Sequence, residues 1–261
     1  MRSIALSDSF LEYFKIDNYL QAAPGGQKTV FIVDIEGKKI ALKIIKTVDE
    51  RLEREIKISE KYATHIGIPS LIRKEEYNGD TVILEEYIEG HDLSELIDQF
   101  VGDEKKVLDL MYRVGIILQP IWLDRYVHRD LKPHNIRICS SGLPVVLDFG
   151  IARALDDDTI TAAGTQPLSW LYASPEQYHG KKELISYRTD FFCLAIIAYR
   201  LFVGRLPFGE SRDEVAESFT KPLAKVSTGS TVVDNFCNAM FHINPSQRPR
   251  KIEAYLNLTS I

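Results

Sequence analysis

Apolar residues in the first third of the chain are distributed in a way that predicts strands joined by tight turns. Residues 16–45 are dense in β-branched and aromatic side chains, and Glu36-Gly37 offers a turn inside that stretch. Residues 71–87 predict a second hairpin, because Asn78-Gly79 is the strongest short hairpin signal. The sequence therefore predicts a β-rich region before residue 88.

Helical patterns fill most of the remaining chain. Residues 48–62 are rich in good helix formers, and residues 105–123 carry apolar side chains three and four positions apart. Pro120 is expected to kink the second helix or end it early. The longest apolar stretch, residues 191–203, is shorter than the roughly 20 residues that a bilayer span needs, so it predicts a buried core helix.

Composition narrows the class of protein. With 45% apolar and 26% charged residues, the chain has the make-up of an ordinary soluble globular protein. Its net charge of −5 gives no electrostatic argument for nucleic-acid binding, which a basic stripe would support. Cys139, Cys193 and Cys237 are odd in number and lack C-x-x-C spacing. A disulfide framework or zinc site is therefore not expected, and the absence of a signal-peptide pattern favours a cytoplasmic location.

The side chains best suited to catalysis or metal binding lie in residues 128–135 and in Asp148-Phe149-Gly150. Asp130 can take up a proton, and the ammonium group of Lys132 can lie on a phosphate. Asn135 and Asp148 offer the amide and carboxylate oxygens that bind magnesium. This combination indicates phosphoryl transfer, in which positioning and charge neutralisation do most of the work.

The segments His128-Arg129-Asp130-Leu131-Lys132-Pro133-His134-Asn135 and Asp148-Phe149-Gly150 resemble the catalytic loop and the magnesium loop of the protein kinase family. The resemblance is to the eukaryotic-like (Hanks-type) Ser/Thr branch, and residues 173–177 have a form common among its bacterial members. It implies that Asp130 orients the acceptor hydroxyl and takes up its proton, while Lys132 neutralises the γ-phosphate. Asn135 and Asp148 would hold the metal.

The same resemblance implies an α+β, bilobal fold. A single kinase domain would cover residues 1–261, beginning with a β-rich lobe at about 1–87 that carries one regulatory helix. A hinge at about 85–90 would lead to a larger, mainly helical lobe at about 91–261.

Residues expected to contact the nucleotide come from both parts of the chain. Lys43 would hold the α- and β-phosphates, with Glu55 as its counter-ion; a surface lysine and a solvated glutamate are the alternatives. Residues 23–30 lie where the family has its glycine-rich loop, although a plain hairpin turn is the alternative there. The complete set implied by the resemblance is Gly25, Gly26, Val30, Ala41, Lys43, Glu55, Glu86, Ile88, Asn135 and Asp148.

An activation and substrate segment is expected between the magnesium loop and residue 176. Arg129 marks family members in which phosphorylation orders this segment, and Thr159 and Thr161 are the candidate acceptors. Two ordinary loop threonines are the alternative. Thr165 would help to seat the substrate near Asp130.

Two further residues are expected to have a structural role. Glu176, at the end of the Ala173-Ser174-Pro175-Glu176 motif, would form a buried, bidentate ion pair with Arg248. Asp190 would hold the backbone of the catalytic loop.

Departures from the family pattern keep a second function class open. Lys28 replaces a glycine, Glu85 occupies a position that is usually apolar or small, and Ser59 stands where an apolar residue is usual. These departures support the alternative of a pseudokinase, which binds nucleotide or a partner without turnover. A third class, kinases of small molecules, generally lacks Lys132 together with Pro133.

The sequence favours an active Ser/Thr protein kinase that transfers the γ-phosphate of ATP to proteins, with autophosphorylation. The expected cofactors are ATP and Mg²⁺, with Mn²⁺ as the alternative ion. The expected partners are protein substrates and a separately encoded regulator, with no nucleic acid and no membrane segment.

Overall fold

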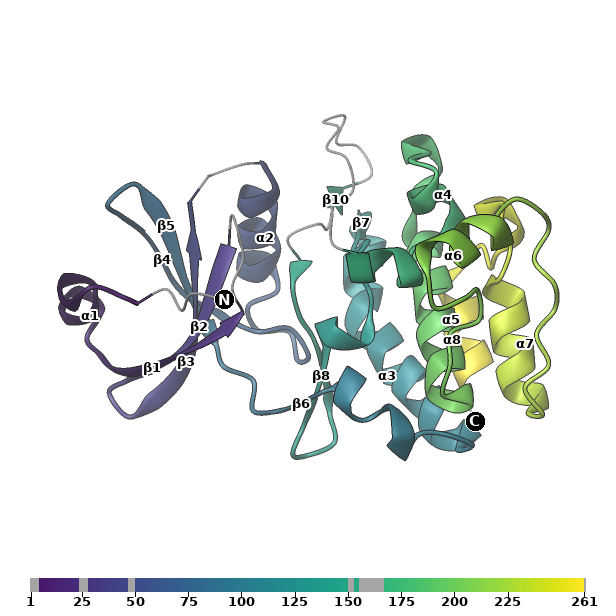
Figure 1. Ribbon diagram of the computed structural model, residues 1–261, viewed down its shortest axis with the longest axis horizontal. Coiled ribbons are helices and arrows are strands. Elements are labelled where there is room, and N and C mark those ends of the chain that lie inside the picture. Colours follow the sequence, from purple (N-terminus) through teal and green to yellow (C-terminus); the bar gives the residue numbers. More distant parts are fainter. Residues whose placement is uncertain (1–4, 24–27, 47–49, 150–152, 155–166, 261) are drawn as a thin grey trace. The chain divides into compact units, whose positions relative to one another are not determined.

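The computed structural model describes residues 5–23, 28–46, 50–149, 153–154 and 167–260. The chain divides into two compact units, Met1–Glu89 and Gly90–Ile261. The first unit is built on one sheet, and the second is mainly helical (Figure 1). This arrangement confirms the predicted α+β fold class.

The first unit contains a five-stranded antiparallel sheet in the order β1-β2-β3-β5-β4. Its strands are β1 (Ile16–Ala23), β2 (Lys28–Ile35), β3 (Lys38–Ile45), β4 (Leu71–Tyr77) and β5 (Asp80–Glu86). Both predicted turns are confirmed. Glu36 and Gly37 have φ of 51° and 74°, and Asn78 and Gly79 have φ of 52° and 85°. Positive φ at both central residues is what a two-residue hairpin turn of type I′ requires.

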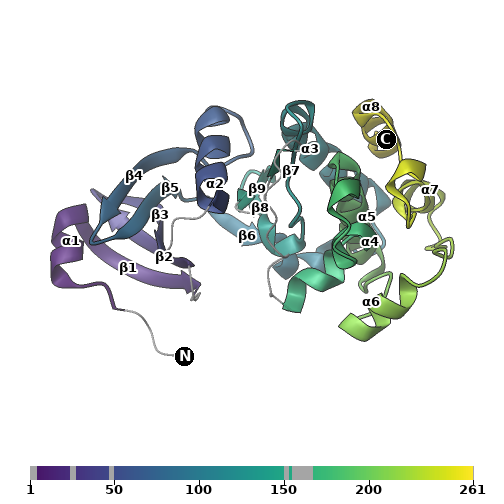
Figure 2. The same ribbon diagram turned by 90° about the horizontal axis from the view of Figure 1, so that it is seen from above.

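The two faces of this sheet are covered by different helices. Successive side chains of a strand point to opposite faces. Val82 and Leu84 of β5 accordingly share a core with α1 (Asp8–Phe14), whereas Ile83 packs with Ile56 of α2 (Glu50–Lys61). Figures 1 and 2 both show α1 and α2 on opposite sides of the sheet.

Helix α1, which has only seven residues, was not predicted from the sequence. Its signals are local ones. The Ser7 hydroxyl accepts from the N–H of Phe10 at the start, and Lys15 ends the helix with φ of 55°. Phe10 and Phe14, four positions apart, place both rings against Tyr77 at centroid distances of 5.1 and 5.6 Å. Aromatic packing onto the sheet therefore stabilises a helix too short to form alone.

The second unit is organised around α5, whose residues are buried over most of its length. Helix α5 lies between α3 and α7 in both ribbon views (Figures 1 and 2). None of the helices among the described residues has both the length and the apolarity of a membrane span. The helices are α3 (Glu104–Leu123), α4 (Pro175–Tyr178), α5 (Tyr187–Val203), α6 (Arg212–Ser218), α7 (Thr231–Met240) and α8 (Ile252–Thr259).

Short strands and 3₁₀-helices frame the loops of this unit. One small sheet has the order β6-β8-β9, and a second pairs β7 with β10. The strands are β6 (Gly90–Asp92), β7 (Tyr126–Val127), β8 (Ile136–Cys139), β9 (Pro144–Val146) and β10 (Arg153–Ala154). The 3₁₀-helices are η1 (Leu93–Glu95), η2 (Ile97–Gln99), η3 (Pro133–Asn135), η5 (Pro167–Tyr172), η6 (Lys182–Leu184) and η7 (Pro245–Gln247).

The apolar pattern predicted that α3 reaches residue 123, and Pro120, which was expected to kink the helix or end it early, does not end it early. The helix continues to Leu123, with Ile121 and Trp122 both buried. A proline in the last turn removes only one backbone hydrogen bond, and the burial of the two large side chains that follow it outweighs this loss.

The packing of α3 on α8 generates a prediction about Gly115. A Cβ atom at this position would lie 2.5 Å from a ring carbon of Tyr255, which is fully buried and donates its hydroxyl to the Met111 carbonyl. We expect Gly115→Ala to lower the free energy of unfolding by about 1–3 kcal/mol, although alanine favours a helix, because the held ring cannot move away. Chemical denaturation measures this. Ile116→Ala, at the exposed next position, is the control; equal effects would contradict the prediction.

Candidate functional site

Lys43 lies in the middle of β3 and is buried, with an exposed fraction of 8%. Its Nζ forms an ion pair with Oε2 of Glu85 at 2.7 Å, and Glu85 is buried as well. A buried ammonium group requires a compensating charge or hydrogen bonds. The structure therefore excludes the surface-lysine alternative and gives Lys43 a carboxylate partner inside its own sheet.

The register of the sheet explains why these two side chains meet. Ala41 is the partner of Glu85 in the β3–β5 pairing, and Lys43 is the partner of Ile83. Lys43 and Glu85 are thus diagonal neighbours on the same face, close enough for a long side chain to reach across. The sequence identified Glu85 only as a departure from the family pattern, and its pairing with Lys43 was missed.

Glu55, the counter-ion expected from the sequence, belongs to α2. Its side chain lies outside the described residues. A pairing between Glu55 and Lys43 therefore stays a prediction.

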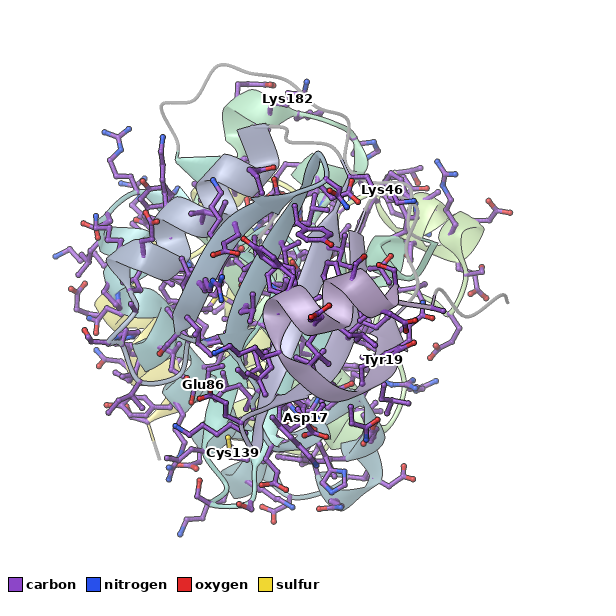
Figure 3. The ribbon with its side chains drawn as sticks, turned by 90° about the vertical axis from the view of Figure 1, so that its left-hand side faces the viewer. Asp17, Tyr19, Lys46, Glu86, Cys139 and Lys182 are labelled. Carbon is purple, nitrogen blue, oxygen red and sulfur yellow. The ribbon has the colours of Figure 1, made fainter. Side chains whose placement is uncertain are left out.

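The other residues of the first unit that were expected to contact the nucleotide lie on or near strands β2, β3 and β5. Val30 is half-buried and opposite Lys43 in the β2–β3 register. Glu86, labelled in Figure 3, ends β5 with an exposed side chain, while its backbone N–H donates to the Ser70 carbonyl at 2.9 Å. Ile88 and Ala41 are half-buried, and Gly25 and Gly26 lie outside the described residues.

In the second unit, three of the expected side chains meet at one carboxylate. Oδ2 of Asp130 accepts from Nζ of Lys132 at 2.8 Å and from Nδ2 of Asn135 at 3.0 Å. The same Asn135 amide nitrogen donates to the Asp130 carbonyl at 2.7 Å. Lys132 and Asn135 are buried, and Asp130 is half-buried. The carboxylate is therefore held in one orientation by neighbours in its own loop.

Asn135 and Asp148 are brought to the same end of the β8–β9 hairpin. Ile136 pairs with Val146, and the next backbone bond joins the Leu147 N–H to the Asn135 carbonyl at 2.8 Å. Asp148 follows directly, with an exposed side chain and φ of 60°. Because the Asn135 amide nitrogen is committed to Asp130, its oxygen is the atom suited to a cation. A carboxylate and an amide oxygen suit Mg²⁺, whose remaining positions water and phosphate can fill.

Asp190 holds the backbone of the loop of residues 128–135, as predicted. It is fully buried and accepts three hydrogen bonds, from the N–H groups of His128 (2.8 Å) and Arg129 (3.0 Å) and from the Trp122 indole (2.9 Å). Burial raises the pKa of the Asp190 carboxyl, whereas His128 and the three donors act in the opposite direction. His128, also buried, donates Nε2–H to the Leu147 carbonyl at 3.0 Å and so joins this loop to the residue directly before Asp148.

Glu176 and Arg248 form a bidentate ion pair with no exposed side-chain surface. Nη1 of Arg248 lies 2.7 Å from Oε1 of Glu176, and Nη2 lies 2.8 Å from Oε2. Thr189 donates a further hydrogen bond to Glu176, and the His242 carbonyl accepts from the guanidinium. Both charges are thus satisfied by hydrogen bonds as well as by each other.

Sequence reasoning missed one polar residue beside the catalytic loop. Gln177 donates its amide nitrogen to the Arg129 carbonyl at 2.6 Å. The only signal was its position directly after Glu176. Arg129 itself is half-buried, whereas Thr159, Thr161 and Thr165 lie outside the described residues.

The chemistry available in each unit follows from these contacts. Among its described residues, the first unit presents the buried ammonium group of Lys43 on strand β3. The second presents a fixed carboxylate, Asp130, with the ammonium group of Lys132 beside it. It also places the side chains of Asn135 and Asp148, which offer oxygen atoms, at a neighbouring hairpin end. These groups can accept a proton, neutralise phosphate charge and bind a divalent cation.

Known proteins resemble this chain over most of its length. A family model described as the protein kinase domain matches residues 26–257. The chain is 32% identical over 202 residues to the serine/threonine-protein kinase PrkC of Bacillus subtilis. The aligned residues cover 74% of this chain and 31% of that protein. The chain is 34% identical over 174 residues to a probable serine/threonine-protein kinase PknB of Bifidobacterium longum, covering 59% of this chain and 24% of that protein.

A third relative, the serine/threonine-protein kinase PknA of Corynebacterium glutamicum, is 28% identical over 207 residues, covering 74% of this chain and 44% of that protein. The aligned part thus spans between 24% and 44% of the length of these three relatives.

The Lys43–Glu85 pair should stabilise the first unit. We expect Glu85→Gln to lower the free energy of unfolding by roughly 3 kcal/mol, the lower end of the cost of breaking a buried pair, because the amide oxygen still accepts one hydrogen bond. Thermal and chemical denaturation measure the loss. Glu86→Gln, at the exposed neighbouring position, is the matched control. If both variants unfold at the same denaturant concentration, the pair does not stabilise the sheet.

The Glu176–Arg248 pair gives a second stability prediction. Glu176→Gln should cost about 3–5 kcal/mol, because it leaves a buried guanidinium without its counter-charge. Glu183→Gln, at an exposed position of η6, should change stability by less than about 0.5 kcal/mol. Denaturant titration of both variants checks this, and a loss below 1 kcal/mol for Glu176→Gln would show that the buried pair is not needed.

Proposed function

The chain belongs to the protein kinase family, and on that premise we propose that it is a serine/threonine protein kinase. It transfers the γ-phosphate of ATP to serine or threonine hydroxyls of protein substrates. The observation that carries the proposal is the set of contacts at Asp130, where Lys132 and Asn135 hold a single carboxylate oxygen. The printed names of the three relatives support the same activity.

Asp130 is the proposed catalytic base. Its carboxylate accepts the proton of the substrate hydroxyl and orients that hydroxyl for attack on phosphorus. Lys132 lies within 2.8 Å of the same carboxylate. It therefore brings positive charge to the place where the γ-phosphoryl group accumulates negative charge during transfer. The contacts of Asn135 keep the carboxylate from rotating away.

Lys43, Asn135 and Asp148 are the proposed nucleotide and metal residues. Lys43 has amine hydrogens that can donate to the α- and β-phosphates in addition to its bond with Glu85. Asn135 and Asp148 would hold a divalent cation through oxygen, and the family uses ATP with such an ion. We propose Mg²⁺, with Mn²⁺ as the alternative. When bound, the cation neutralises the charge of the transferring phosphates.

Regulation and partners are proposed from the sequence alone. Thr159 and Thr161 are the candidate autophosphorylation sites, and Arg129 is the residue that a phosphate there would pair with. Protein substrates, a separately encoded regulator and a cytoplasmic location complete the proposal.

A nucleotide-binding pseudokinase is the second candidate. One observation favours it: the buried carboxylate of Glu85 already neutralises Lys43, so phosphate must share this ammonium group with another anion. The two candidates differ in turnover rather than in nucleotide binding.

Turnover with labelled ATP and Mg²⁺ separates them. We expect the chain to label itself and a generic protein substrate, and Asp130→Asn to lower the rate by about 10²–10⁴-fold, the usual contribution of a catalytic base. Nucleotide binding by Asp130→Asn should stay intact, since Asp130 touches the acceptor rather than the adenosine. A wild-type rate equal to that of Asp130→Asn, with nucleotide still bound, would identify the pseudokinase.

A further inference from the structure

The peptide that leads into Asp130 has a backbone conformation that needs support. Arg129 has φ of 70°, in the left-handed region that residues other than glycine rarely adopt. Such a conformation costs on the order of 1–3 kcal/mol and persists where surrounding groups determine it. Asp190 holds the N–H of Arg129 at 3.0 Å. The carbonyl of Arg129, which belongs to the peptide bond with Asp130, must be held from another side.

Gln177 supplies that second contact. Its Nε2 donates to the Arg129 carbonyl at 2.6 Å. The orientation of the amide is determined by its oxygen, which accepts from the Ser174 N–H at 3.0 Å and from the Cys193 thiol at 3.5 Å. Burial raises the pKa of the Cys193 thiol well above its ordinary value, so the sulfur keeps its proton and acts as the donor. A flipped amide would place donor against donor and oxygen against oxygen.

The helix that carries Gln177 is itself anchored. Glu176, the preceding residue, forms the buried ion pair with Arg248. At the start of this helix, Ser174 and Gln177 form a capping box, in which each side chain accepts from the backbone N–H of the other. Helix α4 follows η5 almost directly. The position of the Gln177 amide is therefore set by the stretch that ends the proposed substrate segment.

We propose that Gln177 is a positioning residue for Asp130 and that it links the placement of this segment to the orientation of the catalytic base. Asp190 holds the N–H of the peptide before Arg129. The peptide between Arg129 and Asp130 is held at both ends, because its C=O accepts from Gln177 and its N–H donates to Nδ1 of His128 at 3.3 Å. Without the Gln177 donor, the left-handed conformation of Arg129 loses one of its supports and the backbone of Asp130 is held less firmly, while Lys132 and Asn135 continue to orient the carboxylate within the loop. The proposal rests on the proposed kinase function.

A pair of variants in the full chain separates positioning from local stability. Gln177→Met has a similar length but no donor for the Arg129 carbonyl. Ser174→Ala weakens the same capping box and leaves the Gln177–Arg129 contact intact, since the Ser174 group that Gln177 accepts from is backbone. Both variants should lower the melting temperature, because both lose a helix cap.

Steady-state kinetics should then separate the two variants. We expect Gln177→Met to lower kcat by about tenfold or more with KM for ATP within about twofold, since a misplaced base impairs the chemical step rather than nucleotide binding. Ser174→Ala should keep kcat within about twofold. A Gln177→Met variant with kcat within twofold of the wild type, or a Ser174→Ala variant with an equal loss, would overturn the proposal.

A second measurement does not depend on turnover. Hydrogen–deuterium exchange of the peptide covering residues 124–136 should be faster in Gln177→Met than in the wild type, and unchanged in Ser174→Ala, because the released loop opens more often. Equal exchange in all three proteins would overturn the positioning role. If the wild type transfers no more phosphate than Asp130→Asn, the kinase function fails, whereas the exchange result still decides the contact.

Discussion

The loop of residues 128–135 depends on one buried carboxylate, that of Asp190. Removing this group from water is costly unless its oxygens are hydrogen-bonded, and three N–H donors meet that requirement. Two of the donors are consecutive backbone amides of the loop, and the third is Trp122 at the end of α3. The buried surface of α5 therefore holds a polar loop in place by giving its backbone a charged acceptor. A charged acceptor forms stronger hydrogen bonds than a carbonyl does.

Buried charges recur in both units, and each is compensated within its own unit. Lys43 pairs with Glu85 inside the sheet, and Glu176 pairs with Arg248 inside the helical unit. Such pairs add little net stability compared with apolar residues of the same size, but removal of one partner is strongly destabilising. Their value is geometric. A side chain that must meet a specific partner at hydrogen-bond distance occupies one position, which apolar packing alone would not require.

Much of the fold could be predicted from the sequence, because its signals are local. The Asn78-Gly79 and Glu36-Gly37 turns, the helix formers of α2 and the apolar stretch of α5 each act through neighbouring residues. Helix α1 was missed because its stability comes from the rings of Phe10 and Phe14 against Tyr77, a contact between residues more than sixty positions apart. Helix α3 ends at Leu123, as the apolar pattern predicted, and not early at Pro120. Burial of Ile121 and Trp122, which sequence cannot display, outweighs the local effect of Pro120.

The residues of the candidate site also divide into those with local sequence signals and those that depend on long-range contacts. Asp130, Lys132, Asn135 and Asp148 were visible because they lie in two short segments of recognisable spacing. The contacts of Glu85 and Gln177 were not, because each depends on a register or a helix position that brings distant residues together.

Glu85 shows most clearly what a motif leaves out. The family pattern supplies a lysine and a helical glutamate, whereas the sheet of this chain adds a second carboxylate at 2.7 Å from the same amine. A carboxylate carried by a strand of the same sheet moves with Lys43 as one body, while a carboxylate on a helix can move independently. The position of Lys43 is consequently determined in part by the hydrogen-bonding register of β3 and β5.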